Sequence, residues 1–313
     1  MNRFDIKDYV VRDVALGKYT SMGVGGVADY LIEADSLKKI KQAVAWAREN
    51  NLNYKIIGRG TNIIVGGKGF RGLVIVNKTS GINFDLKKSR VIVESGYSLS
   101  RLILDVAAQG LGGMEKLFGI PGSIGGALTV NAGTHGVSIG SFLQTASILT
   151  SDGRIRGSNA KYFGFDYRTS NLKAQKAKNP PIILNVIFQL HKKKKDAIIS
   201  EIAKSKSFRE KNQPLGKKTS GSIFKNPSGS DTRDNIKEKS AGYLLELSGA
   251  KSFSVDGAAV SKKHANWIVN KGRADSESIR ILIEKMREAV KEKFSVTLEE
   301  EVEYFGQWNE RKK

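Results

Sequence analysis

The chain has 313 residues, of which 40% are hydrophobic and 27% charged, a composition typical of a folded globular protein with two or three domains. It has no cysteine and three histidines, which excludes disulfides, thiolate catalysis and iron–sulfur clusters, so any redox chemistry must come from a bound organic cofactor. The formal net charge of +21 favours polyanions: nucleic acid, anionic lipid headgroups or small ligands that carry phosphates. Because there is no long apolar stretch and no secretion-signal pattern, we expect a cytoplasmic protein with no membrane partner.

The first predicted elements alternate between helix and strand. Ser36 can cap a helix over residues 37–50, whose apolar side chains fall on one face. Short β-rich runs follow at residues 63–65 and 73–76, separated by the turn segment GGKGFRG. These elements predict a first domain over residues 1–79.

A second predicted domain covers residues 80–205. It begins with a strand at residues 91–93 and a helix that Ser98 caps. A glycine-dense region follows over residues 110–140, then a buried strand at residues 182–190. Another helix begins at Asp196.

The third predicted domain, residues 206–313, contains a helix at residues 241–247 and a long helix at residues 276–294. A final strand over residues 296–305 would separate an apolar face from an acidic one: Val296, Leu298, Val302 and Tyr304 against Glu299, Glu301 and Glu303. The whole pattern predicts an α+β fold.

Four glycine-rich segments follow apolar runs: TSMGVGG (20–26), GRGTN (58–62), GIPGSIGG (119–126) and NAGTHG (131–136). Glycine allows positive φ and lets backbone amides approach a ligand closely. None of the four completes the dinucleotide fingerprint or the P-loop pattern. A single such turn is more often a tight structural connection. Four of them on a strongly basic chain favour a large phosphate-bearing cofactor.

Seven motifs together resemble a known family: YTSMGVGGVADYLIEA, IIGRGTNIIVGGKGFRGLVI, GMEKLFGIPGSIGGALTVNAGTHG, FDYRTS, TSGSIFKNP, GAAVSKKHANWIVN and VTLEEEVEYFG. They are similar, in this order, to the UDP-N-acetylenolpyruvoylglucosamine reductases, in the shorter (type II) form, over residues 19–306. The resemblance implies a vanillyl-alcohol-oxidase-type fold, in which domains 1–79 and 80–205 are the two FAD-binding subdomains and domain 206–313 binds the substrate. The chain departs from the family pattern at Arg59, where glycine is usual, and at His135, where tyrosine is common.

The resemblance also implies that NADPH is the hydride donor and that the glycine loops bind FAD. FAD would be noncovalent, because the chain has neither cysteine nor a histidine attachment motif. The implied cofactor-binding residues are Gly58, Gly60, Thr61, Asn62, Gly119, Pro121, Gly122, Ser123, Gly125, Gly126, Asn131 and Gly133.

The family reaction reduces the enolpyruvyl ether of UDP-N-acetylglucosamine enolpyruvate to UDP-N-acetylmuramate, a precursor of peptidoglycan. By resemblance, Ser222 gives the proton to C2, Arg168 pairs with the substrate carboxylate, and Glu301 works with Arg168 around the charge that develops. The residues alone leave simpler readings open. Ser222 could be one polar residue of a turn, Arg168 a surface partner of Asp166, and Glu301 part of a solvated acidic face.

The same motifs imply the substrate-binding residues. Lys225 and Asn226 would contact the phosphates or the enolpyruvyl group, Lys217 would contact the diphosphate, and Tyr167 would position the substrate.

Two other functions compete with this prediction. A different flavoenzyme on the same cofactor fold would explain the glycine loops, although not GSIFKNP together with the closing glutamate motif. A basic nucleic-acid-binding protein is allowed by the charge, but no helix-turn-helix, RNP or zinc-finger pattern is present. We therefore expect no specific nucleic-acid partner.

Overall fold

The computed structural model describes residues 6–175, 177–227 and 240–309. The chain forms two compact units, each built from separate stretches of sequence. Unit 1 comprises Met1–Val14, Ala28–Arg59 and Gly72–Arg209, and unit 2 comprises Ala15–Val27, Gly60–Arg71 and Glu210–Lys313. The early part of the chain therefore contributes to both units.

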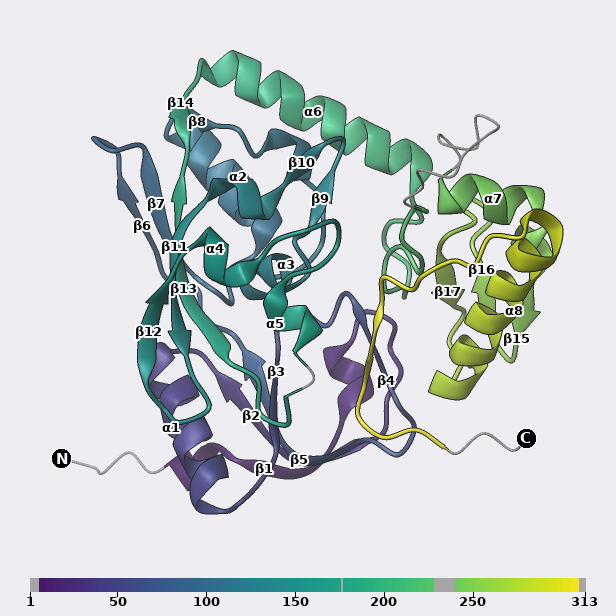
Figure 1. The fold of residues 1–313 in the computed structure, drawn as a ribbon, viewed down its shortest axis with the longest axis horizontal. Helices are drawn as coiled ribbons and strands as arrows, with labels where there is room; N and C mark the ends of the chain where they lie inside the picture. The colour runs from purple at the N-terminus through teal and green to yellow at the C-terminus, as the bar shows by residue number, and fades with distance from the viewer. Residues whose placement is uncertain (1–5, 176, 228–239, 310–313) are drawn as a thin grey trace. The chain divides into compact units, whose positions relative to one another are not determined.

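A four-stranded sheet and one helix form the first half of unit 1 (Figure 1). The sheet has the order β1 (Val11–Ala15), β2 (Val27–Ala34), β5 (Phe70–Asn77) and β3 (Tyr54–Ile57). Helix α1 (Leu37–Glu49) begins at Ser36, whose hydroxyl accepts a hydrogen bond from Lys39 N. Its apolar face, which includes Ile40 and Val44, is buried in a core with strand residues such as Leu73. The capped helix predicted at residues 37–50 is confirmed.

A five-stranded antiparallel sheet forms the second half of unit 1. Its order is β12 (Ile155–Ser158), β11 (Leu143–Leu149), β13 (Ile182–Gln189), β7 (Arg90–Glu94) and β6 (Ile82–Asp85). Helices α2 (Leu99–Ala108) and α3 (Ile124–Thr129) contribute to the core that lies against the sheet, and Ser98 caps α2 as predicted. The long helix α6 (Lys195–Asn212) follows the predicted buried strand.

Short elements complete unit 1. They are η1 (Ile6–Tyr9), β8 (Leu111–Gly112), η3 (Glu115–Leu117), β9 (Gly133–Thr134), β10 (Val137–Ser138), η4 (Ile139–Phe142), α4 (Ala160–Phe163), α5 (Asn171–Ala174) and β14 (His191–Lys192). The β9–β10 pair carries the predicted NAGTHG segment.

Unit 2 packs two helices with a three-stranded antiparallel sheet. The strands are β15 (Ser254–Val255), β16 (Ala258–Val260) and β17 (Ile268–Asn270), and the helices are α7 (Ala241–Leu247) and α8 (Ser276–Phe294). Both helices lie where the sequence predicts them. A separate parallel pair joins β4 (Ile63–Val65) to β18 (Glu303–Phe305). The 3-10 helices η2 (Leu16–Tyr19) and η6 (Ala250–Ser252) complete the unit.

Two predicted boundaries are wrong. Strand β5 already begins at Phe70, inside the segment predicted as a turn. The closing strand predicted over residues 296–305 is formed only at Glu303–Phe305. The residues before it change partner along the chain: Glu301 N donates to Ile223 O at 2.8 Å, whereas Glu303 N donates to Asn62 O at 3.0 Å. Such a segment satisfies its backbone groups without forming one continuous ladder.

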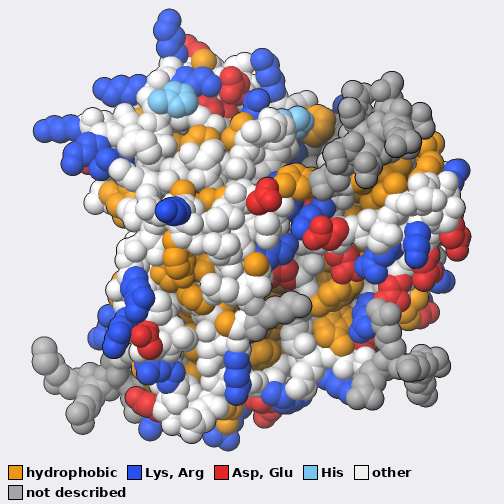
Figure 2. All heavy atoms as spheres, in the orientation of Figure 1, with side chains coloured by type: hydrophobic (Ala, Val, Ile, Leu, Met, Phe, Trp, Pro, Cys, Tyr) orange, Lys and Arg blue, Asp and Glu red, His pale blue; other side chains and the backbone are white. Residues whose placement is uncertain are grey.

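The surface is rich in lysine. Figure 2 shows blue side chains at the edge of unit 1 that β6, β7 and β14 form in Figure 1, and Lys87, Lys88, Lys192 and Lys194 are exposed there. Over the described ranges, no helix is long and apolar enough to cross a membrane. Within the same ranges, no group of three or more His, Cys, Asp or Glu side chains could hold a metal ion.

Candidate active site

Two predicted cofactor loops meet in unit 1. An ideal Cβ placed on Gly58 would lie 2.0 Å from Ser123 Oγ, closer than any side chain tolerates. Gly58 directly follows β3 and begins the GRGTN segment, and Ser123 lies in the GIPGSIGG loop. Only glycine allows this approach, so the two loops are packed backbone to side chain at this point.

The GIPGSIGG loop has the backbone that its glycines predict. Gly119 has φ +81° and Gly122 has φ +140°, values that disfavour other residues. Ser123 caps α3 by accepting a hydrogen bond from Gly126 N at 3.4 Å. A Cβ on Gly125 would lie 3.1 Å from Ser95 Cβ, so this glycine packs against a buried neighbour. The loop therefore has few side chains and a backbone conformation that only glycine adopts easily, features that suit a diphosphate site.

Arg168 lies in a strained turn of unit 1. Its φ is +54°, in the left-handed region, and its Nη2 donates to Gly133 O at 2.5 Å. Asn131 fixes the turn, because its Nδ2 donates to Asp166 O at 2.9 Å and its Oδ1 accepts from Gly140 N. The guanidinium lies 5.2 Å from the centroid of the exposed Tyr167 ring. Such strain occurs often at functional sites, where surrounding contacts hold it in place.

Arg209, which the sequence analysis missed, is a buried charged residue of unit 1. Only 9% of it is exposed, and its Nε donates to Phe118 O at 2.8 Å. A Cβ on Gly119 would lie 2.6 Å from Arg209 Cδ. Residues 205 and 209 lie on the same face of α6 as the buried Ile198 and Ile202. This helical spacing was the sequence signal that could have indicated burial of Arg209.

In unit 2 the remaining glycine segments meet the TSGSIFKNP motif. Ser21 N donates to Gly60 O at 2.9 Å, and the Ser21 hydroxyl donates to Thr219 O at 2.6 Å. Asn62 Nδ2 donates to Glu301 O at 3.2 Å. Thr61 lies between these two contact points and is half-buried. Four motifs from distant parts of the sequence thus come together in one unit.

Ser222 and Glu301 lie on two segments that are hydrogen-bonded to each other at Ile223, the residue after Ser222. Ile223 N donates to Asn266 O at 2.9 Å, and Ile223 O accepts from Glu301 N at 2.8 Å. Ser222 itself forms an isolated bridge with Trp267. Both predicted catalytic residues of unit 2 are half-buried. The structure therefore joins the segment of Ser222 to the segment of Glu301 by a backbone hydrogen bond at Ile223.

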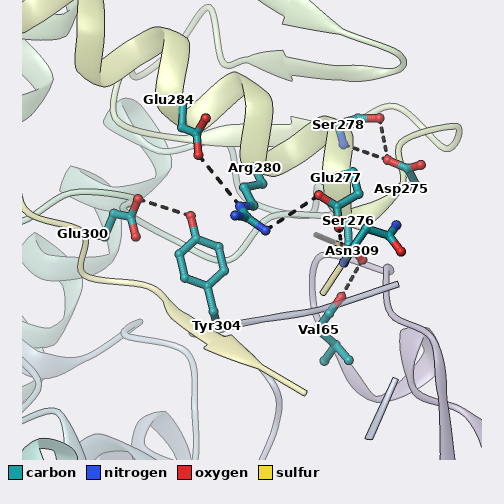
Figure 3. A network of polar contacts seen from close by, with 10 residues as sticks. All are labelled: Val65, Asp275, Ser276, Glu277, Ser278, Arg280, Glu284, Glu300, Tyr304 and Asn309. Atoms are coloured by element: carbon teal, nitrogen blue, oxygen red, sulfur yellow. Dashed lines mark hydrogen bonds and ion pairs between the residues drawn. The ribbon is translucent and has the colours of Figure 1, made fainter. Parts of the chain in front are cut away.

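The two glutamates before Glu301 have structural roles. Glu299 forms an ion pair with Lys225, and Glu300 pairs with Arg287. Figure 3 shows that Glu300 also accepts a hydrogen bond from the Tyr304 hydroxyl. The same figure shows a network of polar contacts at the start of α8, formed by Val65, Asp275, Ser276, Glu277, Ser278, Arg280, Glu284 and Asn309. The contacts of Glu299, Glu300 and Tyr304 hold the closing motif, and the predicted alternation of residues along a strand did not indicate them.

Polar groups near Ser222 indicate a ligand. The hydroxyls of Thr219 and Ser220 are buried and have no hydrogen-bond partner among the described residues. Gly221 has φ +82°, and a Cβ there would meet nothing within 4 Å. Buried hydroxyls normally have partners, so a bound molecule or water is expected beside this segment.

A basic hollow of about 570 Å³ lies elsewhere in unit 2. Its lining includes Lys217, Lys251, Lys262, Lys263 and Lys271 together with apolar residues such as Phe253. Lysine ammonium groups around an apolar floor suit a phosphate-bearing ligand with an organic ring.

The other predicted substrate residues of unit 2 do not line this hollow. Lys225 forms an ion pair with Glu299, and Asn226 Oδ1 accepts a hydrogen bond from Ala241 N at 3.1 Å. The Asn226 side chain therefore helps to hold the start of α7.

Comparison with known proteins identifies the family. Residues 28–158 match the family model described as an FAD binding domain, and residues 213–305 match the UDP-N-acetylenolpyruvoylglucosamine reductase C-terminal domain. The chain is 34% identical to the UDP-N-acetylenolpyruvoylglucosamine reductase of Bacillus subtilis over 297 residues, which cover 95% of this chain and 94% of that protein. It is 36% identical to reductase 1 of Bacillus cereus, with 93% of each chain covered.

A solved structure agrees with these matches. The UDP-N-acetylenolpyruvylglucosamine reductase of Thermus caldophilus aligns with a TM-score of 0.77 and 31% identity, covering 94% of this chain and 98% of that one. The fold and the matched domains define an FAD-dependent oxidoreductase with the predicted α+β, vanillyl-alcohol-oxidase-type fold. More particularly, the chain belongs to the UDP-N-acetylenolpyruvoylglucosamine reductase family, as its motifs predicted.

The residues present fit FAD. In unit 1 the positive-φ glycines Gly119 and Gly122 and the buried Arg209 place a backbone without side chains and a positive charge in one region, which suits a diphosphate. These residues would hold the cofactor of the family.

Proposed function

We propose that this chain reduces UDP-N-acetylglucosamine enolpyruvate to UDP-N-acetylmuramate with Ser222, Arg168 and Glu301 as its catalytic residues. The observation that supports this assignment most strongly is the backbone hydrogen bond from Glu301 N to Ile223 O, which joins the segment of Glu301 to that of Ser222. It joins the two motifs that distinguish this family from other flavoenzymes. We propose UDP-N-acetylglucosamine enolpyruvate and NADPH as the partners, and no specific nucleic acid.

When bound, FAD would supply the redox chemistry, the transfer of hydride equivalents from NADPH to the enolpyruvyl group. Arg168 binds the substrate carboxylate, and its planar guanidinium remains protonated while negative charge grows there. Glu301 acts with Arg168 around this charge. Ser222 donates its hydroxyl proton to C2, completing the lactyl ether. A serine hydroxyl is a weak acid, but the strongly basic carbon that forms at C2 can take its proton when the two are aligned.

The basic hollow is the proposed site of the UDP diphosphate. Lys217, predicted for this role from the motif, lines the hollow, and we extend the proposal to Lys251 and Lys271, which also line it. Lys225, Asn226 and Tyr167 are proposed to position the sugar and the enolpyruvyl group.

Stopped-flow absorbance of Ser222→Ala tests the proton donor. Reduction of the flavin by NADPH needs no proton at C2 and should proceed at nearly the wild-type rate. Reoxidation by the enolpyruvyl substrate should slow by roughly 100- to 10,000-fold, the usual range for loss of a positioned general acid. Equal slowing of both steps would indicate a displaced flavin, and slowing of neither would remove Ser222 from the mechanism.

A matched pair of variants tests the choice among the glutamates. Glu301→Gln should slow reoxidation by the substrate. Glu299→Gln removes the ion pair with Lys225, a proposed substrate-binding residue, so it should change the apparent substrate affinity but leave the rate of reoxidation at saturating substrate within about threefold of wild type. Slower reoxidation in Glu299→Gln than in Glu301→Gln would show that the catalytic role belongs to another glutamate of the closing motif.

A further inference from the structure

Ser21 connects two motifs that lie far apart in the sequence but in the same unit. Its backbone N–H donates to Gly60 O at 2.9 Å, and its hydroxyl donates to Thr219 O at 2.6 Å. Gly60 belongs to the GRGTN segment, which is predicted to bind FAD. Thr219 is the first residue of TSGSIFKNP, which carries the proposed proton donor Ser222. The half-buried Ser21 is therefore hydrogen-bonded to both segments.

Both hydrogen bonds are part of close packing in unit 2. Gly60 has φ +61°, and a Cβ there would lie 2.0 Å from Tyr19 O, so only glycine lets the GRGTN backbone come this close. Next to the second hydrogen bond, a Cβ on Gly23 would lie 3.0 Å from Lys218 Cδ. Residues 19–23 thus pack against both segments.

The turn around Ser21 is fixed by bonds that do not involve the Ser21 hydroxyl. The hydroxyl of the buried Thr20 lies 3.1 Å from Val24 O, and Asn270 Nδ2 donates to Met22 O at 3.0 Å. Removal of the Ser21 hydroxyl leaves these bonds in place. What it removes is the bond to the TSGSIFKNP segment.

The Ser21 hydroxyl has one proton and two carbonyl acceptors within reach. It lies 2.6 Å from Thr219 O and 3.2 Å from Gly60 O. Because a hydroxyl donates one hydrogen bond, the shorter distance assigns the proton to Thr219 O. Gly60 O already accepts from the Ser21 backbone N–H. The geometry therefore reserves the hydroxyl for the TSGSIFKNP segment.

The bond from Ser21 reaches this segment between two other anchors. β17 and the residues before it hold the segment through bonds to Lys218 O and from Ile223 N, each 2.9 Å long. Between these two points Gly221 has φ +82°, so the backbone there is not one regular strand. The position of the proposed proton donor, which follows Gly221, is thus set in part by how Thr219 is held.

We propose that Ser21 is a positioning residue, whose hydroxyl holds Thr219, and through it Ser222, in a fixed place relative to the GRGTN segment. A proton donor must be aligned with the carbon that it protonates, and small displacements lower the rate steeply. Ser21 acts through Thr219 and is not itself a catalytic residue. The inference rests on the proposed function, because that function gives Ser222 its role as proton donor.

Stopped-flow absorbance of holoenzyme variants tests this role. Ser21→Ala should slow reoxidation by saturating enolpyruvyl substrate about 5- to 50-fold, because the hydrogen bond is lost and the donor is misaligned. Flavin reduction by NADPH needs no proton at C2 and should stay within about twofold of wild type. Ser21→Thr keeps the hydroxyl and should restore most of the rate.

Ser248→Ala is the matched control. It removes another half-buried serine hydroxyl of unit 2, one that donates to Leu245 O at 2.9 Å at the end of α7. Because this bond lies within one local turn, the control should change neither step by more than about twofold.

A double-mutant cycle shows whether Ser21 acts through Ser222. In the Ser222→Ala background, Ser21→Ala should slow reoxidation by less than about twofold, because no proton donor remains to be positioned. If Ser21→Ala loses its FAD, Ser21→Cys takes its place in the cycle, since a thiol is only a weak donor. Equal effects in both backgrounds, equal slowing of both half-reactions, or wild-type rates in Ser21→Ala would overturn the positioning role. Wild-type reoxidation in Ser222→Ala would instead overturn the proposed function.

Discussion

Replacing Gly58 with alanine tests the contact that joins the two cofactor loops of unit 1. The added methyl would lie 2.0 Å from Ser123 Oγ and 3.0 Å from Ser123 Cβ. Gly58 is not among the residues with positive φ, so alanine is allowed by its backbone and the effect is purely steric. Ordinary contact needs about 3.4 Å or more, so the groups must separate by more than about 1 Å.

The structure offers two ways to relieve this overlap. Ser123 can rotate its hydroxyl away and lose the cap of α3, which is worth about 0.5–2 kcal/mol. Alternatively, the loops can move apart, which displaces the loop proposed to bind the diphosphate. We expect Gly58→Ala to lower the free energy of unfolding by about 1–2 kcal/mol and to weaken FAD binding by about 10- to 100-fold.

A double-mutant cycle with Ser123→Gly isolates the contact. Glycine at an N-cap costs only a few tenths of a kcal/mol, and it removes both atoms that the new methyl would strike. The double variant should therefore resemble Ser123→Gly alone, in urea unfolding of the apoprotein and in FAD titration by fluorescence quenching. Gly67→Ala is the control, because a Cβ there meets nothing within 4 Å. Full FAD affinity in Gly58→Ala would refute the reasoning. So would an equal loss of stability and FAD affinity when alanine is introduced at position 58 of the wild type and of Ser123→Gly.

Three further outcomes are expected. Gly122→Val places a β-branched residue at φ +140° and should abolish stoichiometric FAD occupancy, measured by the absorbance ratio of the purified protein; unchanged occupancy would exclude this loop from the cofactor site. The excess positive charge should steer phosphate-bearing substrates to the enzyme. Raising the salt concentration from about 0.05 to about 0.3 M should therefore lower kcat/KM for NADPH and for the UDP-sugar to about a third or less, and kcat/KM values independent of salt would contradict steering. Asp275 caps α8, and its hydrogen bond from Ser278 holds the carboxyl pKa below the usual 3.8. Its contribution, about 1 kcal/mol against Asp275→Ala, should therefore be present above pH 3.8 and disappear as the pH falls through the lowered pKa, as urea unfolding across this range can show.

Local signals made much of the fold predictable. Ser36 and Ser98 cap the helices that their positions predict, and the periodicity of residues 276–294 matches α8. These features depend on neighbours within a few positions in the sequence. The length of the closing strand was overestimated because its residues pair with several distant segments. Alternation of residue type carries no information about such a change of partner.

The site was predictable as a set of residues, although not as an arrangement. The resemblance supplied the predicted roles of Ser222, Glu301 and Arg168, and the structure shows that the segments of Ser222 and Glu301 are hydrogen-bonded to each other. The contact between Gly58 and Ser123 joins positions far apart in the sequence, so no local pattern could indicate it. Arg209 was overlooked among many lysines, because composition does not show which of several charges on a helix is buried.

The parallel pairing of β4 with β18 sets an order of events during synthesis. The Asn62 side-chain amide donates to Glu301 O, and Glu301 is synthesised 239 positions later in the chain. At about 5–20 residues per second, the ribosome needs roughly 12–50 s to make the intervening chain. The residues of β4 must remain unpaired, or be shielded by other proteins, throughout that time. Unit 2 therefore matures late, and slower translation or loss of β18 should lengthen the period in which β4 can pair with the wrong strand.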